Sequence, residues 1–494
     1  MRRIEVDFEK VKGIFNRYAS LCVGAGRAGE VLRKDFDYQL KMTREECGFK
    51  YLRFHGVFHE DMAVYQEDRD GNPVYNWQYV DIVYDAILEK GMKPFVELSF
   101  MPALLASGEK TVFWWKANVT PPNDYTKWYG LIHNFVLHLE ERYGREEVLT
   151  WYFEIWNEPD HPSFFSAGKK EYFELYDWTA KAVKDVCSQY RVGGPATSGC
   201  KWIKDMIDHC YNTGAPINFI STHVYGVAGE FDEFGTKVVK LCKDNRIVSM
   251  VKEVKETVAS SPMPDLEIHF TEWSSSFSIR DALHDSYIQA PYVLSTLKRL
   301  EGVVESMSYW TFTDIFEESG PPLMPFHGGF GLVNLQNLKK PTYFAYKFLN
   351  ELGKDELVNT DNDSWICKEG DNIQALIWDY TQLEQDTYNH IFFKRDLQSK
   401  DLEPVDFKID RLKEGKYLLE LYKTGYAVND VYLDYYKLGS PNSLSKEIVK
   451  ELDSKNSGKP VAVKVVEVGK EMEFRYSLEF RENDVYLLKL KYLL

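Results

Sequence analysis

Two glutamates stand where short apolar runs of the sequence end. Glu158 belongs to the segment Trp156–Pro159, and Glu272 belongs to the segment Phe270–Trp273. The proline after Glu158 stops a strand and fixes the backbone beside the acid. Two facing carboxyl groups can cleave a glycosidic bond, because one protonates the leaving oxygen while the other attacks the sugar or activates water. The sequence alone leaves their separation open, and with it the choice between retention and inversion.

Both glutamates fall inside a repeating pattern that runs from about residue 17 to residue 350. Short apolar runs predict eight strands: Tyr18–Val23, Tyr51–His55, Pro94–Phe100, Trp151–Trp156, Val192–Ala196, Phe219–Tyr225, Glu267–Trp273 and Ser306–Phe312. Stretches of helical period alternate with them, among them Trp77–Lys90, Tyr125–Tyr143, Lys170–Cys187, Ile203–Tyr211, Val248–Val258, Tyr287–Leu300 and Tyr343–Leu352. This alternation predicts an α/β protein with a (β/α)8 TIM barrel over residues 15–350. The glutamates then follow strands four and seven, at the end of the barrel where active sites form.

The pattern changes after Gly353, where short alternating segments are separated by Gly, Asn, Asp and Pro. The segments are Ile373–Trp378, His390–Phe393, Lys416–Tyr422, Val461–Val468 and Val485–Lys491. They predict an accessory C-terminal antiparallel β-sandwich domain built from residues 351–494. Ile4–Phe8 alternates in the same way, so residues 1–14 are expected to belong to this domain and to add a strand to it.

The segment Gly24–Gly29 matches the dinucleotide-binding pattern G-x-G-x-x-G. A dinucleotide site also needs an acid at the end of the second strand, but Tyr51–His55 ends in histidine. We therefore expect no cofactor and interpret the glycines as a tight turn above the first strand, where glycine tolerates positive φ. A nicotinamide-dependent oxidoreductase is the alternative that this segment leaves open.

Charge and cysteine usage narrow the class of protein. A net charge of −16 disfavours nucleic-acid and anionic-membrane surfaces, although a local basic pocket remains compatible with it. The 7 cysteines include no C-x-x-C pair, so we interpret them as free thiols in a reducing compartment. The sequence contains no H-E-x-x-H pattern, so we expect no metal site. The N-terminal residues form no apolar signal segment and no run reaches the ~18 apolar residues of a membrane span, so we expect a cytoplasmic protein.

Taken together, these segments make the chain similar to glycoside hydrolase family 39, in its β-xylosidase branch. The resemblance covers most of the barrel and is carried by Gly24–Gly29, Arg53–Gly56, Phe113–Trp115, Trp156–Pro159, His223–Tyr225, Thr271–Trp273 and Ser308–Glu318. It implies net retention, with Glu158 as general acid/base, Glu272 as nucleophile and Asn157 bonded to the sugar 2-OH. It further implies a sugar-binding subsite lined by His55, His223, Tyr225, Trp310 and Glu318, with Glu317 as the alternative to Glu318.

Such a mechanism needs different proton states for the two carboxyl groups. We expect partial burial and the opposing negative charge to raise the pKa of Glu158, so that it holds a proton near neutral pH. We expect Glu272 to stay ionised because His223 and Tyr225 donate to it. Trp114 and Trp115 could stack on a second sugar or simply pack a long loop, and Glu97 is expected to be structural.

The resemblance also bears on the substrate. In the related α-L-iduronidases a lysine stands two residues after the histidine of the sixth strand, where this chain has Tyr225. A phenol cannot neutralise a uronate, which favours an uncharged sugar. We expect exo-release of β-D-xylose from non-reducing ends of short xylo-oligosaccharides, by an enzyme that assembles as a homo-oligomer, a tetramer by resemblance. An iduronidase, a β-glucosidase or arabinosidase, and a non-catalytic carbohydrate-binding barrel remain as alternatives.

Overall fold

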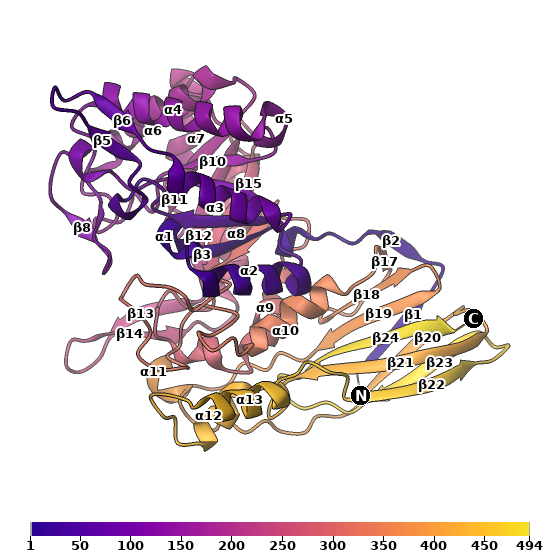
Figure 1. Ribbon diagram of the computed structural model, residues 1–494. Coiled ribbons are helices and arrows are strands. Elements are labelled where there is room, and N and C mark those ends of the chain that lie inside the picture. The colour runs from indigo at the N-terminus through magenta and orange to yellow at the C-terminus, as the bar shows by residue number, and fades with distance from the viewer. Residues whose placement is uncertain (1, 494) are drawn as a thin grey trace.

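A closed barrel of eight parallel strands forms the first part of the protein (Figure 1). The computed structural model describes residues 2–493. In barrel order the strands are β3 (Cys22–Arg27), β4 (Tyr51–His55), β7 (Lys93–Leu98), β10 (Tyr152–Ile155), β11 (Arg191–Thr197), β12 (Phe219–Tyr225), β15 (Glu267–Ser274) and β16 (Ser306–Tyr309). The predicted (β/α)8 fold is confirmed.

Eight longer helices follow the strands and cover the outside of the barrel. They are α2 (Lys34–Cys47), α3 (Gln78–Glu89), α4 (Tyr125–Tyr143), α6 (Lys169–Val186), α7 (Ile203–Thr213), α8 (Arg246–Ala259), α9 (Gln289–Lys298) and α10 (Pro341–Asn350). Local sequence sets several of their ends. Asp124 caps α4 by accepting from the N–H groups of Thr126 and Lys127, and Gly48 ends α2 with a left-handed φ of 78°.

Short elements decorate the loops between these strands and helices. Paired strands are β5 (Tyr65–Glu67) with β6 (Pro73–Tyr75), β8 (Thr111–Val112) with β9 (Ala117–Asn118), and β13 (Val227–Phe231) with β14 (Lys237–Leu241). Single turns of helix are α1 (Ala28–Val31), α5 (Arg145–Val148), η1 (Tyr18–Ser20), η2 (Glu60–Met62), η3 (Ala103–Leu105) and η4 (Ala282–Asp285). The β13–β14 hairpin projects from the barrel mouth and lines the cavity described below.

Two sequence predictions about the first strand are wrong. The strand spans Cys22–Arg27 rather than Tyr18–Val23, and Tyr18–Ser20 is a turn of 3-10 helix. The segment Gly24–Gly29 is therefore not a turn with positive φ, because its first two glycines lie in β3 and its third lies in α1. These glycines instead allow close approach: a Cβ on Gly24 would lie 2.2 Å from the ring of Trp310.

Two sheets make up the C-terminal region. The larger has the order β2 (Val11–Ile14), β17 (Asp355–Leu357), β18 (Ser364–Glu369), β19 (Asn372–Trp378), β24 (Val485–Leu493), β21 (Gly415–Thr424) and β22 (Ala462–Val468), and is antiparallel throughout. The smaller has the order β1 (Arg3–Asp7), β20 (Val405–Asp410) and β23 (Glu473–Leu478). Apolar side chains of both sheets form one cluster, including Val6, Phe407, Leu419 and Leu488. The predicted C-terminal β-domain is confirmed, and the N-terminal strands β1 and β2 enter one sheet each.

One segment of this region has a different structure from the prediction. His390–Phe393 is not a strand, because Asn389–Phe392 forms the short helix α11 beside the β13–β14 hairpin. Two further helices, α12 (Val431–Lys437) and α13 (Lys446–Lys455), pack against Phe326 and Leu338 of the last barrel loop. Figure 1 shows these helices below the barrel and beside the sheets.

The barrel and the large sheet share one apolar core. Trp365, Trp378 and Leu487 of the sheet belong to the same cluster as the barrel helices. The indole of Trp378 donates to the Ser295 hydroxyl of α9 at 2.8 Å. The domain bounds 15–350 and 351–494 stay a prediction. Within residues 2–493 all 7 cysteines are free, and no helix is both long and apolar enough to cross a membrane.

Candidate active site

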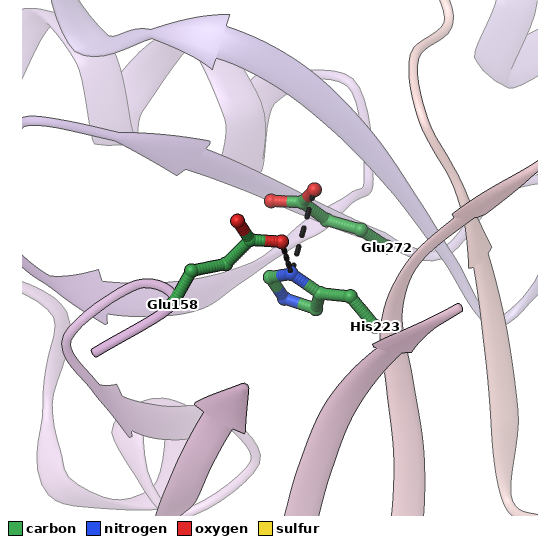
Figure 2. Close-up of side chains that lie close together, drawn as sticks. All are labelled: Glu158, His223 and Glu272. Carbon is green, nitrogen blue, oxygen red and sulfur yellow. Dashed lines mark hydrogen bonds and ion pairs between the residues drawn. The ribbon is translucent and has the colours of Figure 1, made fainter. Parts of the chain in front are cut away.

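The two predicted glutamates meet at the mouth of the barrel. Glu158 follows β10 by three residues, and Glu272 lies near the end of β15. Three atoms lie within 4.8 Å of one another: a carboxylate oxygen of Glu158, a carboxylate oxygen of Glu272 and a ring nitrogen of His223. Figure 2 shows the two carboxyl groups beside the same imidazole ring, with Glu158 on the loop after β10. The barrel thus brings together two acids that are far apart in the chain.

The backbone before Glu158 is strained. Trp156 and Glu158 both adopt left-handed conformations, with φ of 70° and 45°. Residues other than glycine pay a steric penalty there, and such strain gathers at functional sites. The loop is held in place because the Glu158 N–H donates to the Ala196 carbonyl at 2.8 Å and the Trp156 indole donates to the Phe164 carbonyl at 2.9 Å.

Glu272 accepts hydrogen bonds on both of its oxygens. The guanidinium of Arg53 donates to Oε1 at 2.8 Å, and the Tyr225 hydroxyl donates to Oε2 at 2.7 Å. The Nδ1 atom of His223 is 3.5 Å from the same Oε2. The predicted donor Tyr225 is therefore in contact with Glu272, and the strongest positive charge beside this carboxylate belongs to Arg53.

Arg53 is a residue that the sequence analysis did not select for the site. It is fully buried, and its guanidinium contacts Glu97 at 2.7 Å, Glu154 at 2.5 Å and the Asn157 side-chain oxygen at 2.9 Å. A signal was present, because Arg53 and Glu154 are charged residues inside otherwise apolar strands. Such charges are buried only when they are paired. Glu97 is confirmed as a buried partner of Arg53 rather than a cavity-lining acid.

His55 is part of the same charged cluster. Its Nδ1 lies 2.7 Å from Glu97, and its Nε2 lies 3.6 Å from Glu318 and 3.8 Å from Glu272. Burial opposes the charged ring, but the charge of Glu97 and the hydrogen bond to Glu318 raise the pKa of His55 to about 10. The ring of Trp310 packs 4.9 Å from the imidazole. His55 is therefore a buried cation at neutral pH.

The choice between Glu317 and Glu318 is decided by their partners. Glu317 forms ion pairs with Arg27 at 2.9 Å and with Arg33 at 3.0 Å, away from the cavity. Glu318 lines the cavity beside His55. Burial raises the pKa of Glu318 above its ordinary value, and the hydrogen bond to His55 opposes that rise.

The two central carboxyl groups differ in their surroundings. Burial raises the pKa of Glu158 to about 7, and the negative charge of Asp160 adds to the effect. From the sequence alone this second contribution is expected from Glu272, whereas in the structure it comes from Asp160. Burial also raises the pKa of Glu272, but there the neighbouring His223 ring and the Arg53 guanidinium oppose the rise. Asp160 itself is held by Ser198, which donates to it from both its N–H and its hydroxyl at 2.7 Å.

His223 lies beneath the cavity rather than in its wall. Its ring is fully buried, with Nδ1 2.9 Å from Glu158 and Nε2 without a hydrogen-bonding partner in the described structure. Burial lowers the pKa of His223. The ring therefore bridges the two carboxyl groups from below, and its predicted direct contact with sugar has no support from its position.

A cavity of about 580 Å³ opens above these groups. Of the predicted site residues, it is lined by His55, Asn157, Glu158, Tyr225, Glu272, Trp310 and Glu318. Phe113 also lines it, whereas Trp115 is buried behind Phe113 at a ring distance of 5.3 Å. Trp114 is 58% exposed and lies against Gly320 outside the lining. A volume of this order suits a small ligand with several polar contacts.

The sequence and fold place this site among known enzymes. The model of the family described as Glycosyl hydrolases family 39 matches residues 2–470. The chain belongs to that family. A beta-xylosidase of Geobacillus stearothermophilus is 38% identical over 453 residues, covering 89% of this chain and 86% of that protein. A beta-xylosidase of Caldicellulosiruptor saccharolyticus is 43% identical over 358 residues, 72% of each chain. The solved structure of a monomeric beta-xylosidase from Caulobacter crescentus CB15 matches with a TM-score of 0.97 and 40% identity over 100% of both chains.

Family membership makes the chain a glycoside hydrolase, as the sequence analysis predicted. The spacing of Glu158, His223 and Glu272 would also suit a metal ion by distance alone. The chemistry of the group argues otherwise, because Glu272 already accepts from Arg53 and Tyr225 on its two oxygens. A fixed guanidinium beside that carboxylate repels a cation. This glycoside hydrolase has a pair of carboxyl groups balanced by protein charges.

Proposed function

We propose that this family 39 glycoside hydrolase is a retaining β-xylosidase, with Glu158 as general acid/base and Glu272 as nucleophile. The observation that carries the proposal is the separation of the two carboxyl groups, which have oxygens within 4.8 Å of each other. Retaining glycosidases hold their carboxyl groups about 5–5.5 Å apart, whereas inverting enzymes leave about 6.5–9.5 Å for a water molecule. The short separation supports double displacement.

The proton states support the same roles. Burial raises the pKa of Glu158 to about 7, so it holds a proton on the acid side of neutrality and can give it to the leaving oxygen. Glu272, bonded to Arg53 and Tyr225, attacks the anomeric carbon as a carboxylate. Once Glu272 is esterified its charge is gone, which lowers the pKa of Glu158. Glu158 then removes a proton from water, and that water releases the sugar.

The substrate is proposed from the site and from the relatives. Two relatives with the identities given above are named beta-xylosidases. Tyr225 lies beside Glu272, at the position where the related α-L-iduronidases have a lysine. A phenol supplies no positive charge to bind a uronate. The Asn157 oxygen is bonded to Arg53, which leaves its N–H groups for a sugar hydroxyl. We therefore propose release of β-D-xylose from the non-reducing ends of short xylo-oligosaccharides.

The test is a nucleophile variant with chemical rescue. Glu272→Ala is expected to lose turnover of an aryl β-xyloside by at least about 10⁴-fold, because no covalent intermediate forms. Added azide should enter the vacated space and yield the α-glycosyl azide. Glu230→Ala, an exposed acid outside the cavity, is the matched control and keeps wild-type rates. Full activity in Glu272→Ala would refute the assignment.

Stereochemistry and substrate are read together by proton NMR of the wild-type digest. The first product should be β-xylose, which then mutarotates. Initial appearance of α-xylose would instead indicate inversion. A panel of aryl glycosides should place the xyloside first, ahead of the glucoside, the arabinoside and the iduronide. A preference for the iduronide would show that the argument from Tyr225 is wrong.

Assembly and location remain predictions. We propose a tetramer in the cytoplasm, whereas the Caulobacter relative is described as monomeric. Light scattering after size exclusion gives the mass directly, against 57.7 kDa for one chain. Fractionation of the source cell would locate the enzyme.

A further inference from the structure

The active-site cavity extends past the two carboxyl groups toward β11 and β12, where the charged residues that line it are basic instead of acidic. Three cations line this end of the cavity: Lys201 after β11, Lys237 on β14 and Arg246 at the start of α8. All three are exposed to solvent. The acids that line the cavity are Glu158, Glu272 and Glu318, which belong to the catalytic end described above.

Two of these cations have no acidic partner. Lys201 lies 3.0 Å from Asp160, but within residues 2–493 no carboxylate is within ion-pair distance of Lys237 or Arg246. Lys237 lies over the Phe277 ring, 5.2 Å from its centre, and Arg246 donates to the Val227 carbonyl at 3.2 Å. Because the chain has 76 acidic and only 60 basic residues, a basic side chain is expected to have an acidic partner more often than not. Their charge is available to a ligand.

The nearby acids of the hairpin do not face this end of the cavity. Asp232 accepts from the N–H groups of Phe234 and Thr236 and so forms the hairpin turn. Glu230 on β13 and Glu233 in the turn are exposed, and neither is a cavity-lining residue. The charge presented to a molecule in this part of the cavity is therefore positive.

Barrel order shows which part of the substrate would lie here. Glu158 follows the fourth strand, β10, and Glu272 lies near the end of the seventh strand, β15, so the two acids divide the mouth into two sides. His55, Trp310 and Glu318 come from or after β4 and β16 on one side, where they are largely buried. The cations come after β11 and β12 on the other side, which is open. The released xylose needs the enclosed polar side, so the open side receives the leaving group.

We propose that this basic end, formed by Lys237 and Arg246 beside the Phe277 ring, binds a uronic acid carried by the leaving-group portion of the oligosaccharide. The inference rests on the proposed function and names its substrate class: xylo-oligosaccharides in which the xylose on the leaving-group side of the scissile bond carries a glucuronic acid branch. Guanidinium and ammonium groups pair with carboxylates, while an aromatic ring accepts the apolar face of a sugar. The neutral xylose site and the anionic leaving-group site are then separate, on opposite sides of Glu158 and Glu272.

The test compares three substrates: xylobiose, xylobiose with a glucuronic acid on its reducing-end sugar, and the methyl ester of that acid. The acid and its ester have the same scissile bond and nearly the same shape. The wild-type enzyme is expected to cleave the acid with kcat/KM about fivefold above the ester, the size of one partly exposed ion pair. Raising sodium chloride from about 0.01 M to about 1 M should bring the ratio toward one by screening.

Variants of the two cations test whether they cause the preference for the acid over its ester. Lys237→Gln and Arg246→Gln should each lower the acid-to-ester ratio, and the double variant should bring it close to one. Lys243→Gln removes the same charge from an exposed position outside the cavity and should keep the wild-type ratio. A change in the pH profile of both substrates with an unchanged ratio would show that the cations act only on the catalytic acids, which overturns the proposal.

Failure of the two proposals can be told apart. Xylobiose that is not cleaved overturns the proposed function and this inference with it. Xylobiose that is cleaved while the acid reacts no faster than its ester overturns this inference alone. A ratio above one that persists in the double variant also overturns it, because another part of the protein then recognises the carboxylate.

Discussion

At the scale of single residues, Arg53 organises the charges of the site. Its guanidinium contacts Glu97, Glu154 and Glu272, and it also fixes the amide of Asn157. Burial of three carboxylates in one cluster is tolerable only because fixed donors face them. Desolvation opposes its charge, but the surrounding carboxylates hold the pKa of Arg53 above its ordinary value, so it stays ionised.

Arg53→Lys tests this role. A lysine keeps the charge but has no planar fork, so it cannot contact four partners at once. We expect kcat/KM for an aryl β-xyloside to fall by about 10–100-fold, the usual effect of losing a group that orients a reacting side chain. Arg33→Lys, at a half-exposed pair, is the control and should change little. A folded Arg53→Lys enzyme with wild-type kcat/KM would contradict the assignment.

Asp160 is expected to influence the pH dependence of kcat/KM. Burial raises the pKa of Glu158 to about 7, so the carboxyl is protonated below that pH and its proposed acid function is lost as the pH rises through that value. Asp160→Asn removes one cause of the rise, and the freed Lys201 acts in the same direction. The alkaline limb of kcat/KM should move to lower pH by about half a unit. Asp205→Asn, on the exposed face of α7, is the control and should leave the alkaline limb in place. If Asp160→Asn also leaves the limb in place, burial alone sets the pKa of Glu158 and the prediction is wrong.

At the scale of elements, close packing between β3 and the residue after β16 positions the floor of the cavity. Gly24 of β3 lies directly against the ring of Trp310, which in turn contacts His55. The glycine is needed for space rather than for backbone freedom, because its φ is ordinary. A strand that carries a methyl group here would displace the indole.

Gly24→Ala is therefore expected to damage the site more than its size suggests. Its Cβ would lie 2.2 Å from one ring carbon of Trp310 and 2.7 Å from the next, so the ring must move. We expect kcat/KM to fall by about 10-fold or more through misplaced substrate, with a loss of about 1–3 kcal/mol in stability. Gly13→Ala meets no atom within 4 Å and is the control. Kinetics and thermal unfolding of both variants check this, and normal kcat/KM in Gly24→Ala would refute it.

At the scale of the whole molecule, the barrel and the large sheet behave as one packed body. Trp378 is fully buried between them, and its ring is tilted against that of Trp365 with the ring centres 5.1 Å apart. Its indole donates to the Ser295 hydroxyl of α9. One apolar cluster continues across this contact. The opposite face of the large sheet packs on the small sheet in a second apolar cluster, so this sheet contributes side chains to both cores.

Trp378→Ala is expected to destabilise both regions together. Removal of a buried indole costs about 3–5 kcal/mol, and because the core is continuous the protein should still unfold in one calorimetric transition at lower temperature. Val463→Ala, at a valine that is 55% exposed, should change stability by less than about 0.5 kcal/mol. Two separated transitions, with only the second shifted, would contradict the shared core.

The sequence by itself determined the barrel, the C-terminal sheets and the two glutamates, because those depend on local patterns. Alternation of apolar runs and helical stretches needs no knowledge of distant contacts, and Glu158 and Glu272 follow strand ends that this alternation defines. The first strand was misplaced because Cys22–Arg27 includes two glycines, which resemble a turn in sequence but pack as a strand.

Only the tertiary structure decided which charges meet. Arg53, Asp160 and Arg246 occupy three different parts of the chain, and no local pattern shows that the first pairs with Glu272, that the second raises the pKa of Glu158, or that the third lines the same cavity. Electrostatic effects depend on distance and burial in space, and barrel closure alone fixes both.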